Sequence, residues 1–79
     1  MKCLADCKKN KIYKIVKIEN LDESVFNMLK NILIIPGEKI EVTNSNFCKQ
    51  SILVKVSNVS YGIDIKIAKQ IFVEEDNYE

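Results

Sequence analysis

The stretch NILIIPGEKIEV, residues 31–42, runs four aliphatic residues into the only proline of the chain and then alternates apolar with polar positions. An apolar run of this length fits a buried strand, the exit of a helix or a docking surface, and periodicity alone does not choose among them. The part after Pro36-Gly37 is clearer, because Ile40 and Val42 alternate with charged and polar neighbours. That alternation predicts a half-buried strand, so the fold depends on what precedes the Pro-Gly turn.

A short helix is predicted directly upstream, at about residues 22–31. Asp22 fits its N-cap, because a side-chain oxygen at that position accepts a hydrogen bond from a free N–H group of the first turn. The apolar residues at helical spacing, which should form one stripe on the core, are Val25, Met28, Leu29 and Ile32.

The opening run then divides between two elements. Ile32 belongs to the helical stripe and Ile34 to the entry into the next strand, and both are predicted to be buried. Leu33 and Ile35 are apolar residues beyond those that the predicted core requires. We therefore expect one of them to be exposed and to serve as a partner contact.

The other segments are predicted as short strands separated by turns. The first strand covers residues 11–18, which are rich in β-branched and aromatic residues, with a twist or bulge where Ile15 adjoins Val16. Asn44-Ser45-Asn46 and Ser57-Asn58 are predicted turns. The further predicted strands are 52–57, then 59–63 with Val59, Tyr61 and Ile63 pointing inward, and finally 71–73, which follows a helical turn near 65–69 that Asp64 can cap.

This order of elements predicts one mostly β domain over residues 1–79, with its core at about 4–74 and an acidic tail at 75–79. About five short antiparallel strands favour a small barrel that closes its edges, because a chain this short cannot build a sandwich. One short helix lies between the first and second strands.

Composition excludes several classes of protein. Hydrophobic residues make up 47% of the 79, and the net charge is +1 with no basic block, so neither disorder nor nucleic-acid binding is favoured. No apolar run reaches the roughly 20 residues that span a bilayer, and the first residues lack the apolar segment of a signal peptide. We expect a cytoplasmic protein that does not insert into a membrane.

The three cysteines, Cys3, Cys7 and Cys48, do not have the spacing of a structural zinc site, and the chain has no histidine. In a reducing compartment we expect these cysteines to keep free thiols and to pack as small apolar residues. Ferrous-ion binding through the cysteines, or through carboxylates such as Asp64 and Glu74, remains the alternative. No resident cofactor is predicted.

Catalysis is not expected, because the chain has no histidine, no glycine-rich phosphate loop and no nucleophile elbow. Most aromatic residues fall at positions that the strand and helix patterns assign to the core. Phe47 is the exception, since it lies in the polar segment NSNFCKQS. Its side chain either folds back over the end of the barrel or is exposed to a partner.

The whole pattern resembles the FeoA family, small proteins of bacterial ferrous iron uptake with an SH3-like barrel. Asn10 and Asn58 stand where the family often has glycine, and asparagine tolerates a left-handed backbone. Leu33 also stands at a usual glycine, and Met28 replaces a frequent arginine. The other matching positions are Leu4, Cys7, Ile32, Ile34, Pro36, Gly37, Ile40, Val42, Ile52, Val54, Val56, Ile63, Ala68, Ile71 and Val73.

The resemblance implies a non-catalytic accessory protein that docks on the cytoplasmic part of FeoB, the membrane ferrous iron transporter, and modulates it. The candidate contact residues are Leu33, Ile35 and Phe47. Two alternatives stay open: a direct carrier of ferrous ion, and a regulatory domain related to the SH3-like domains of iron-dependent repressors.

Overall fold

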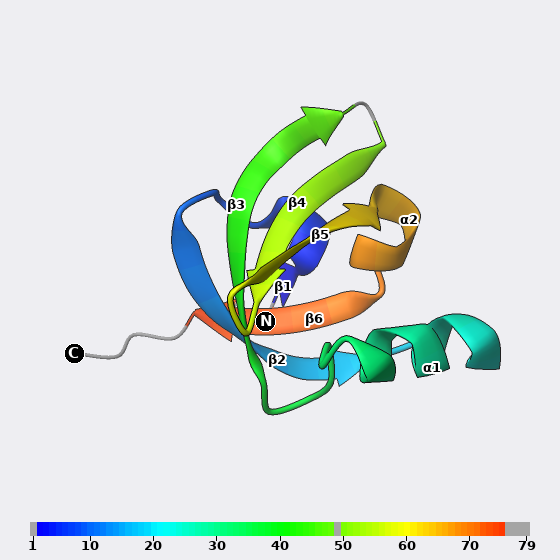
Figure 1. Cartoon of the computed structure of the whole chain (residues 1–79). Helices are drawn as coiled ribbons and strands as arrows, with labels where there is room; N and C mark the ends of the chain where they lie inside the picture. Colours follow the sequence, from blue (N-terminus) through cyan, green and yellow to red (C-terminus); the bar gives the residue numbers. More distant parts are fainter. Residues whose placement is uncertain (1, 49, 76–79) are drawn as a thin grey trace.

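The computed structural model describes residues 2–48 and 50–75, and the side chains of residues 45–48 lie outside the description. The elements in chain order are β1 (Lys2–Cys3), a 3₁₀ turn η1 (Leu4–Asp6), β2 (Lys11–Ile18), α1 (Glu23–Asn31), β3 (Lys39–Cys48), β4 (Ser51–Val56), β5 (Val59–Asp64), α2 (Ile65–Ala68) and β6 (Ile71–Glu75). Figure 1 shows how these elements follow one another.

All six strands belong to one antiparallel sheet with the order β1-β6-β2-β3-β4-β5. This confirms the mostly β, SH3-like fold with two short helical segments. The described residues form six strands and not about five, because the two residues of β1 pair with β6. The predicted closure is wrong: β1 and β5 stand at opposite ends of the sheet order, so the sheet curves without closing.

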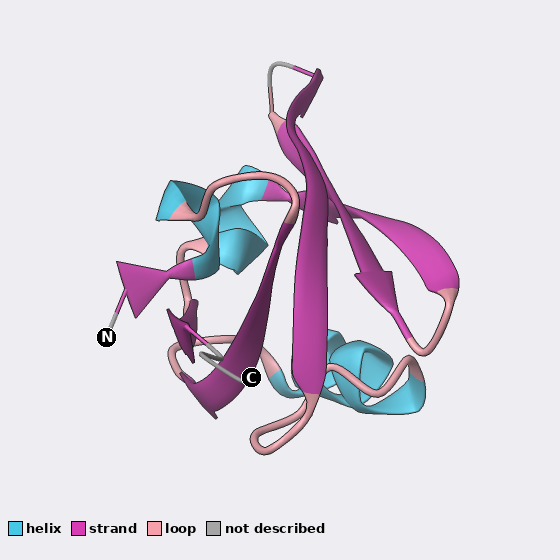
Figure 2. Cartoon of the chain, turned by 90° about the vertical axis from the view of Figure 1, so that its left-hand side faces the viewer, coloured by secondary structure: helices cyan, strands magenta, loops and turns pink. Residues whose placement is uncertain are grey.

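The core lies on the concave side of this curved sheet. The buried apolar residues are Leu4, Cys7, Tyr13, Ile15, Leu29, Ile34, Ile40, Val42, Ile52, Val54, Val56, Ile63, Ala68, Ile71 and Val73. In Figure 2 the helical segments gather at two places, and α1 is the one at the lower end of the sheet. The predicted burial of Ile34 is confirmed, and Ile32 packs half-buried against the core.

Two predicted irregularities of the strands had different outcomes. The bulge in β2 is confirmed, because its register with β6 shifts between Ile15 and Lys17. The turn predicted at Asn44-Ser45-Asn46 is wrong, because β3 continues through these residues to Cys48. The register between β3 and β4 shifts on both sides of Asn44. Irregular pairing of this kind lets β3 continue past the polar residues without ending there.

The end of the chain is ordered further than predicted. Glu75, assigned to an acidic tail, is the last residue of β6, and its carboxylate lies 3.1 Å from the ammonium group of Lys11. Residues 76–79 lie outside the described residues. Within the described residues, no helix is long and apolar enough to cross a membrane.

Candidate partner-binding surface

Leu33 occupies a position that normally favours glycine. Its backbone is left-handed, with φ 68°, and directly follows the C-cap residue of α1. The N–H of Ile34 donates to the carbonyl of Leu29 at 2.8 Å, and the N–H of Leu33 donates to the carbonyl of Lys30 at 3.1 Å. These two bonds define a Schellman motif, in which the residue that Leu33 occupies must be left-handed.

This motif explains which residues of the apolar run are buried. A Schellman motif brings the residue after the left-handed position against the last turn of the helix. Ile34 and Leu29 occupy the two positions of this contact, and both are 0% exposed members of the core. The Leu33 side chain points away from that contact and is 45% exposed. The prediction that one of the two surplus residues is exposed is therefore confirmed for Leu33.

Ile35 begins the tight turn that connects α1 to β3. The N–H of Glu38 donates to the carbonyl of Ile35 at 3.1 Å, and Gly37 has φ 96°, which identifies a type II turn with Pro36 at its second position. Two hydrogen bonds with Ile15 of β2, one from Gly37 N–H at 2.8 Å and one to the carbonyl of Glu38 at 2.9 Å, fix the turn on the sheet. Ile35 is half-buried beside Leu33, and we call these two residues the Leu33 surface.

Phe47 does not join the Leu33 surface. Its backbone lies near the far end of β3, and its side chain lies outside the described part of the structure. Eight residue steps along β3 separate it from Lys39, and at roughly 3.3 Å per residue they span about 26 Å. A partner that contacts both ends would have to cover the length of the sheet, so the three predicted contact residues do not form one compact site.

Other apolar side chains are exposed that the sequence did not single out for a partner: Ile12, Val16, Met28 and Val59. Met28 was predicted on the core stripe of α1, and this is wrong, since its side chain is 46% exposed. Successive helical residues are rotated by about 100°, so burial of Leu29 turns Met28 to the flank of the helix. Val25 and Ile32 lie closer to the direction of Leu29 and are half-buried.

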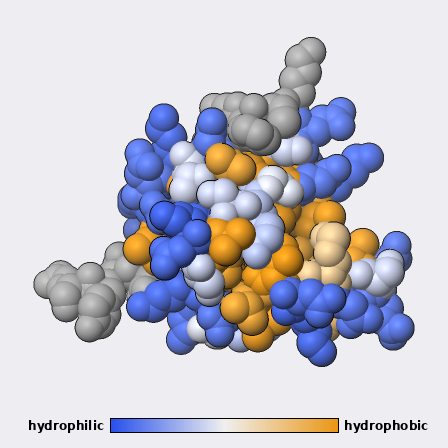
Figure 3. All heavy atoms as spheres, viewed as in Figure 1, coloured by the Kyte–Doolittle hydropathy of each residue, from blue (hydrophilic) through white to orange (hydrophobic). Residues whose placement is uncertain are grey.

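Val59 was predicted to be buried, but its side chain is 49% exposed. The predicted direction is right, because Val59 pairs with Val56, which faces the core. Val59 remains exposed because β5 is the last strand of the sheet, and no further strand among residues 2–48 and 50–75 covers it. Figure 3 shows apolar atoms gathered on the face that carries β5 and α1, with hydrophilic atoms around them.

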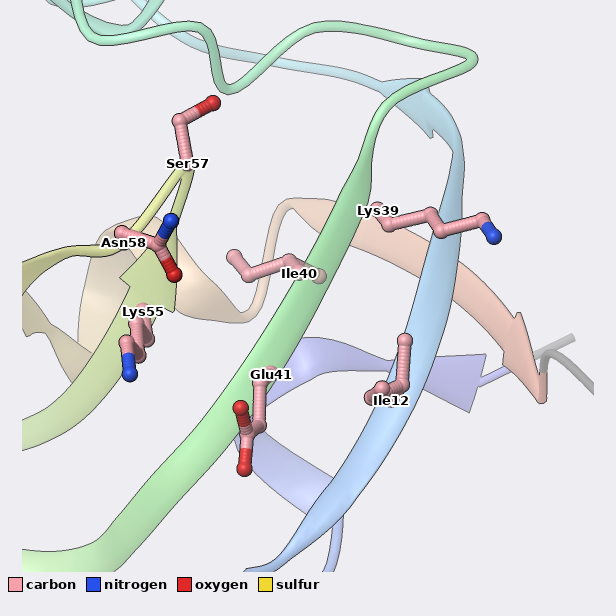
Figure 4. A pocket seen from close by; sticks show the side chains of 7 residues that line it. All are labelled: Ile12, Lys39, Ile40, Glu41, Lys55, Ser57 and Asn58. Atoms are coloured by element: carbon pink, nitrogen blue, oxygen red, sulfur yellow. The ribbon is translucent and has the colours of Figure 1, made fainter.

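A shallow hollow of about 210 Å³ lies on the other face of the sheet, across β2, β3 and β4. Its lining residues are Ile12, Lys39, Ile40, Glu41, Lys55, Ser57 and Asn58 (Figure 4). Ile12 is directly opposite Glu41, which in turn is opposite Lys55. Charges of both signs surround the exposed Ile12, so this hollow offers little continuous apolar area to a protein partner.

The clear pKa shifts among the described residues have structural causes. Burial raises the pKa of the Cys7 thiol to about 11, so this thiol is protonated and not nucleophilic near neutral pH. The hydrogen bond between Lys11 and Glu75 raises the pKa of the lysine and lowers that of the glutamate, and both side chains are at the surface. Neither effect prepares a group for acid or base chemistry.

The residues considered for metal binding are dispersed. Cys3 donates to a carboxylate oxygen of Asp6 at 3.3 Å, and Cys7 donates to the Cys3 carbonyl at 3.5 Å. Asp64 caps α2, as predicted, by accepting from the N–H of Lys66 at 2.8 Å. Within the described residues, no three cysteine or carboxylate side chains gather into a group that could hold a metal ion. The Cys48 side chain lies outside that description.

Comparison with known proteins gives one family and one fold. Residues 2–75 match the family model of the FeoA domain. A crystal structure of the iron uptake regulatory protein FeoA is similar with a TM-score of 0.81 and 20% identity, over 94% of this chain and 95% of that one. Among curated proteins, none matches significantly.

Two further solved structures are larger than this chain. The iron(II) transport protein A from Clostridium thermocellum has a TM-score of 0.83 and 23% identity, over 94% of this chain and 45% of that one. A manganese-dependent transcriptional repressor has a TM-score of 0.84 and 16% identity, over 94% of this chain and 41% of that one. At these identities the likeness shows the shared fold.

Proposed function

The chain belongs to the FeoA family, and from that membership we propose that it is a non-catalytic accessory protein that docks on the cytoplasmic part of a FeoB-type ferrous iron transporter and modulates it. Docking is proposed at the Leu33 surface. The observation that carries the proposal is an apolar side chain, 45% exposed, at a left-handed position that glycine would occupy without strain.

The strain at Leu33 is what makes this residue more than an ordinary exposed apolar side chain. A left-handed backbone costs an L-residue about 1–2 kcal/mol. Natural proteins keep residues that conflict with the local backbone mainly at functional sites. Leu33 is only about half buried, with 45% of it exposed, whereas Ile34 beside it is fully buried. Contact with a partner would give the exposed leucine a role that glycine, which avoids the strain, could not fill.

The size of the expected contribution follows from the exposed fraction. Full burial of a leucine side chain contributes about 1.5–3 kcal/mol. Leu33 is already slightly more than half buried, so covering the remaining 45% should contribute about 1 kcal/mol to binding. This corresponds to about a fivefold change in Kd.

Leu33→Asn tests the proposal, because asparagine tolerates the left-handed backbone and removes the apolar surface. Binding to the purified cytoplasmic domain of the transporter should weaken about fivefold, while the thermal stability of the variant stays at or above that of the original protein. Ile12→Asn is the matched control, since Ile12 is similarly exposed but lies in the hollow on the other face. Equal affinity for Leu33→Asn and the original protein would remove the Leu33 surface from the proposal.

Direct transport of ferrous ion has weaker support. Metal ligands of the cysteine type must be deprotonated, and burial holds the Cys7 thiol protonated up to about pH 11. Asp64 is engaged as the cap of α2, and Glu74 lies on another strand, directly opposite Lys14 in the sheet register. Anaerobic titration with ferrous ion measures this alternative; binding at micromolar metal would favour a carrier. The likeness to a manganese-dependent repressor is one of fold and does not by itself favour a regulatory role.

A further inference from the structure

The free edge of β5 is available for pairing with another strand. β5 is the last strand in the sheet order, and within the part of the chain that the structure describes it pairs with β4 alone. The pairing is regular from Ser51↔Asp64 to Val56↔Val59, without a bulge. An edge strand of this kind presents a row of unpaired N–H and carbonyl groups, which are a template for strand addition.

The turn between β4 and β5 determines which backbone groups face the free edge. Ser57 and Asn58 have φ 51° and 66°, as in a type I′ turn, which the hydrogen-bonded pair Val56↔Val59 closes. Hydrogen-bonded and other pairs then alternate, so Val59, Tyr61 and Ile63 direct their backbone groups toward β4. The bond from Ile65 N–H to the Gln50 carbonyl, at 2.7 Å, continues the same alternation.

Ser60 and Gly62 consequently direct their N–H and carbonyl groups to the free edge. Among the described residues, no hydrogen bond beyond the pairing with β4 uses these groups. Proteins usually protect an exposed edge with lysine, proline or a bulge, and residues 59–63 of β5 contain none of these. Gly62 also favours strand addition at this edge, because a glycine inside a regular strand often marks the close approach of another backbone.

We propose that the occupant of this edge is a second copy of the chain, which pairs its own β5 antiparallel with the first. Around a two-fold axis at Tyr61, Ser60 of one copy would face Gly62 of the other. Each such pair exchanges two N–H to carbonyl bonds, which makes four bonds in the dimer. A symmetric antiparallel pair of this kind joins the two sheets into one.

The side chains of β5 are compatible with this self-pairing. In the register with Tyr61 on the axis, the exposed Val59 comes opposite Ile63 of the second copy, on the same face as the core. The acidic Asp64 comes opposite the neutral Asn58, so no like charges face each other across the axis. A net charge of +1 per chain adds little repulsion. The interface is a short one, and we expect a reversible dimer that forms at high concentration.

Sedimentation equilibrium over a concentration series measures the association directly. The weight-average mass of the original chain should rise with concentration toward twice the 9.1 kDa of one copy. Ser60→Pro should stay at the mass of one copy, because proline removes an N–H that faces the free edge and not one that bonds β4. Ser60→Ala keeps that N–H and should associate like the original protein.

Amide hydrogen exchange on the original chain keeps the proposal testable if Ser60→Pro does not fold. The amides of Ser60 and Gly62 should exchange fast in dilute solution and become protected at the concentration where the mass rises. A monomer at the highest concentration reached would overturn the proposal. So would a dimer in which these two amides stay unprotected, because that dimer would use another surface.

Discussion

Replacing Leu33 with glycine and, separately, with alanine should reveal the backbone strain at the end of α1. Both variants remove the same partly exposed side chain, so the loss of its packing largely cancels in the comparison. They differ in the backbone, because alanine keeps the strain of φ 68° and glycine does not. We expect the glycine variant to be the more stable of the two.

The magnitude follows from two opposing terms. A left-handed backbone costs an L-residue about 1–2 kcal/mol. Glycine also lowers the free energy of unfolding by about 0.4–1 kcal/mol relative to alanine, because it adds conformational entropy to the unfolded chain. The net difference in the free energy of unfolding is therefore about 1 kcal/mol in favour of glycine, which corresponds to about 4–8 °C in Tm for a domain of this size.

Urea denaturation of the two purified variants under identical conditions measures the difference. Their m-values should agree, since the same surface is exposed on unfolding. A third variant, Leu33→Asn, should fall between them, because asparagine tolerates a left-handed backbone better than alanine does. The reasoning is refuted if the alanine variant is as stable as the glycine variant or more stable.

Two further predictions concern the turn after α1 and the buried thiol. Gly37→Ala should lower the free energy of unfolding, measured in urea, by about 1 kcal/mol, because alanine is strained at φ 96°. An added Cβ meets nothing within 4 Å, so the backbone strain is the whole effect. An unchanged urea midpoint would contradict the type II turn. Burial raises the pKa of Cys7 from 9.0 to about 11, so its contribution to stability is complete below about pH 9 and is lost as pH rises toward 11. Denaturation at about pH 8 and pH 10.5 should show a smaller decline for Cys7→Ala than for the original protein, and equal declines would contradict that role.

Local sequence signals predicted those parts of the fold that depend on the backbone preferences of a few residues. Pro36-Gly37 predicted a turn, which the structure identifies as type II, and Asn58 stands where the family resemblance indicated a left-handed residue. Asp64 was identified as a helix cap from the residues that follow it. In each case the interaction spans a few residues, so one short segment contains the whole cause.

Two failures are local: Met28 lies on the flank of α1, and the Asp22 side chain makes no hydrogen bond to cap that helix. The other features that failed depend on neighbours distant in sequence. Alternation placed Val59 on the correct face of β5, but its exposure depends on the absence of a further strand, which is a property of the whole sheet. The length of β3 depends on bulges that let Asn44 stay in the strand against β4. Closure of the sheet depends on whether β1 reaches β5, and no local pattern reports this.

The candidate surface shows the same division. The surplus of apolar residues and the family's glycine at position 33 predicted that Leu33 or Ile35 would be exposed, and the structure shows that it is Leu33, at φ 68°. Ile35 was grouped with it because the two are neighbours in the chain. Phe47 was grouped with them only because it is apolar in a polar segment, and the length of β3 separates it from both. Its role as a partner contact stays a prediction.

The central claim, that a transporter docks on the Leu33 surface, is tested most directly by mapping the contact on the chain itself. The isotope-labelled protein is titrated with the unlabelled cytoplasmic domain of a FeoB-type transporter, and the backbone amide signals are followed by NMR. The account predicts that the signals of Leu33 and Ile35 shift or broaden first, while those of Ile12 and Lys55, in the hollow on the other face, do not change. Changes confined to that hollow, or no change at saturating transporter domain, would contradict it.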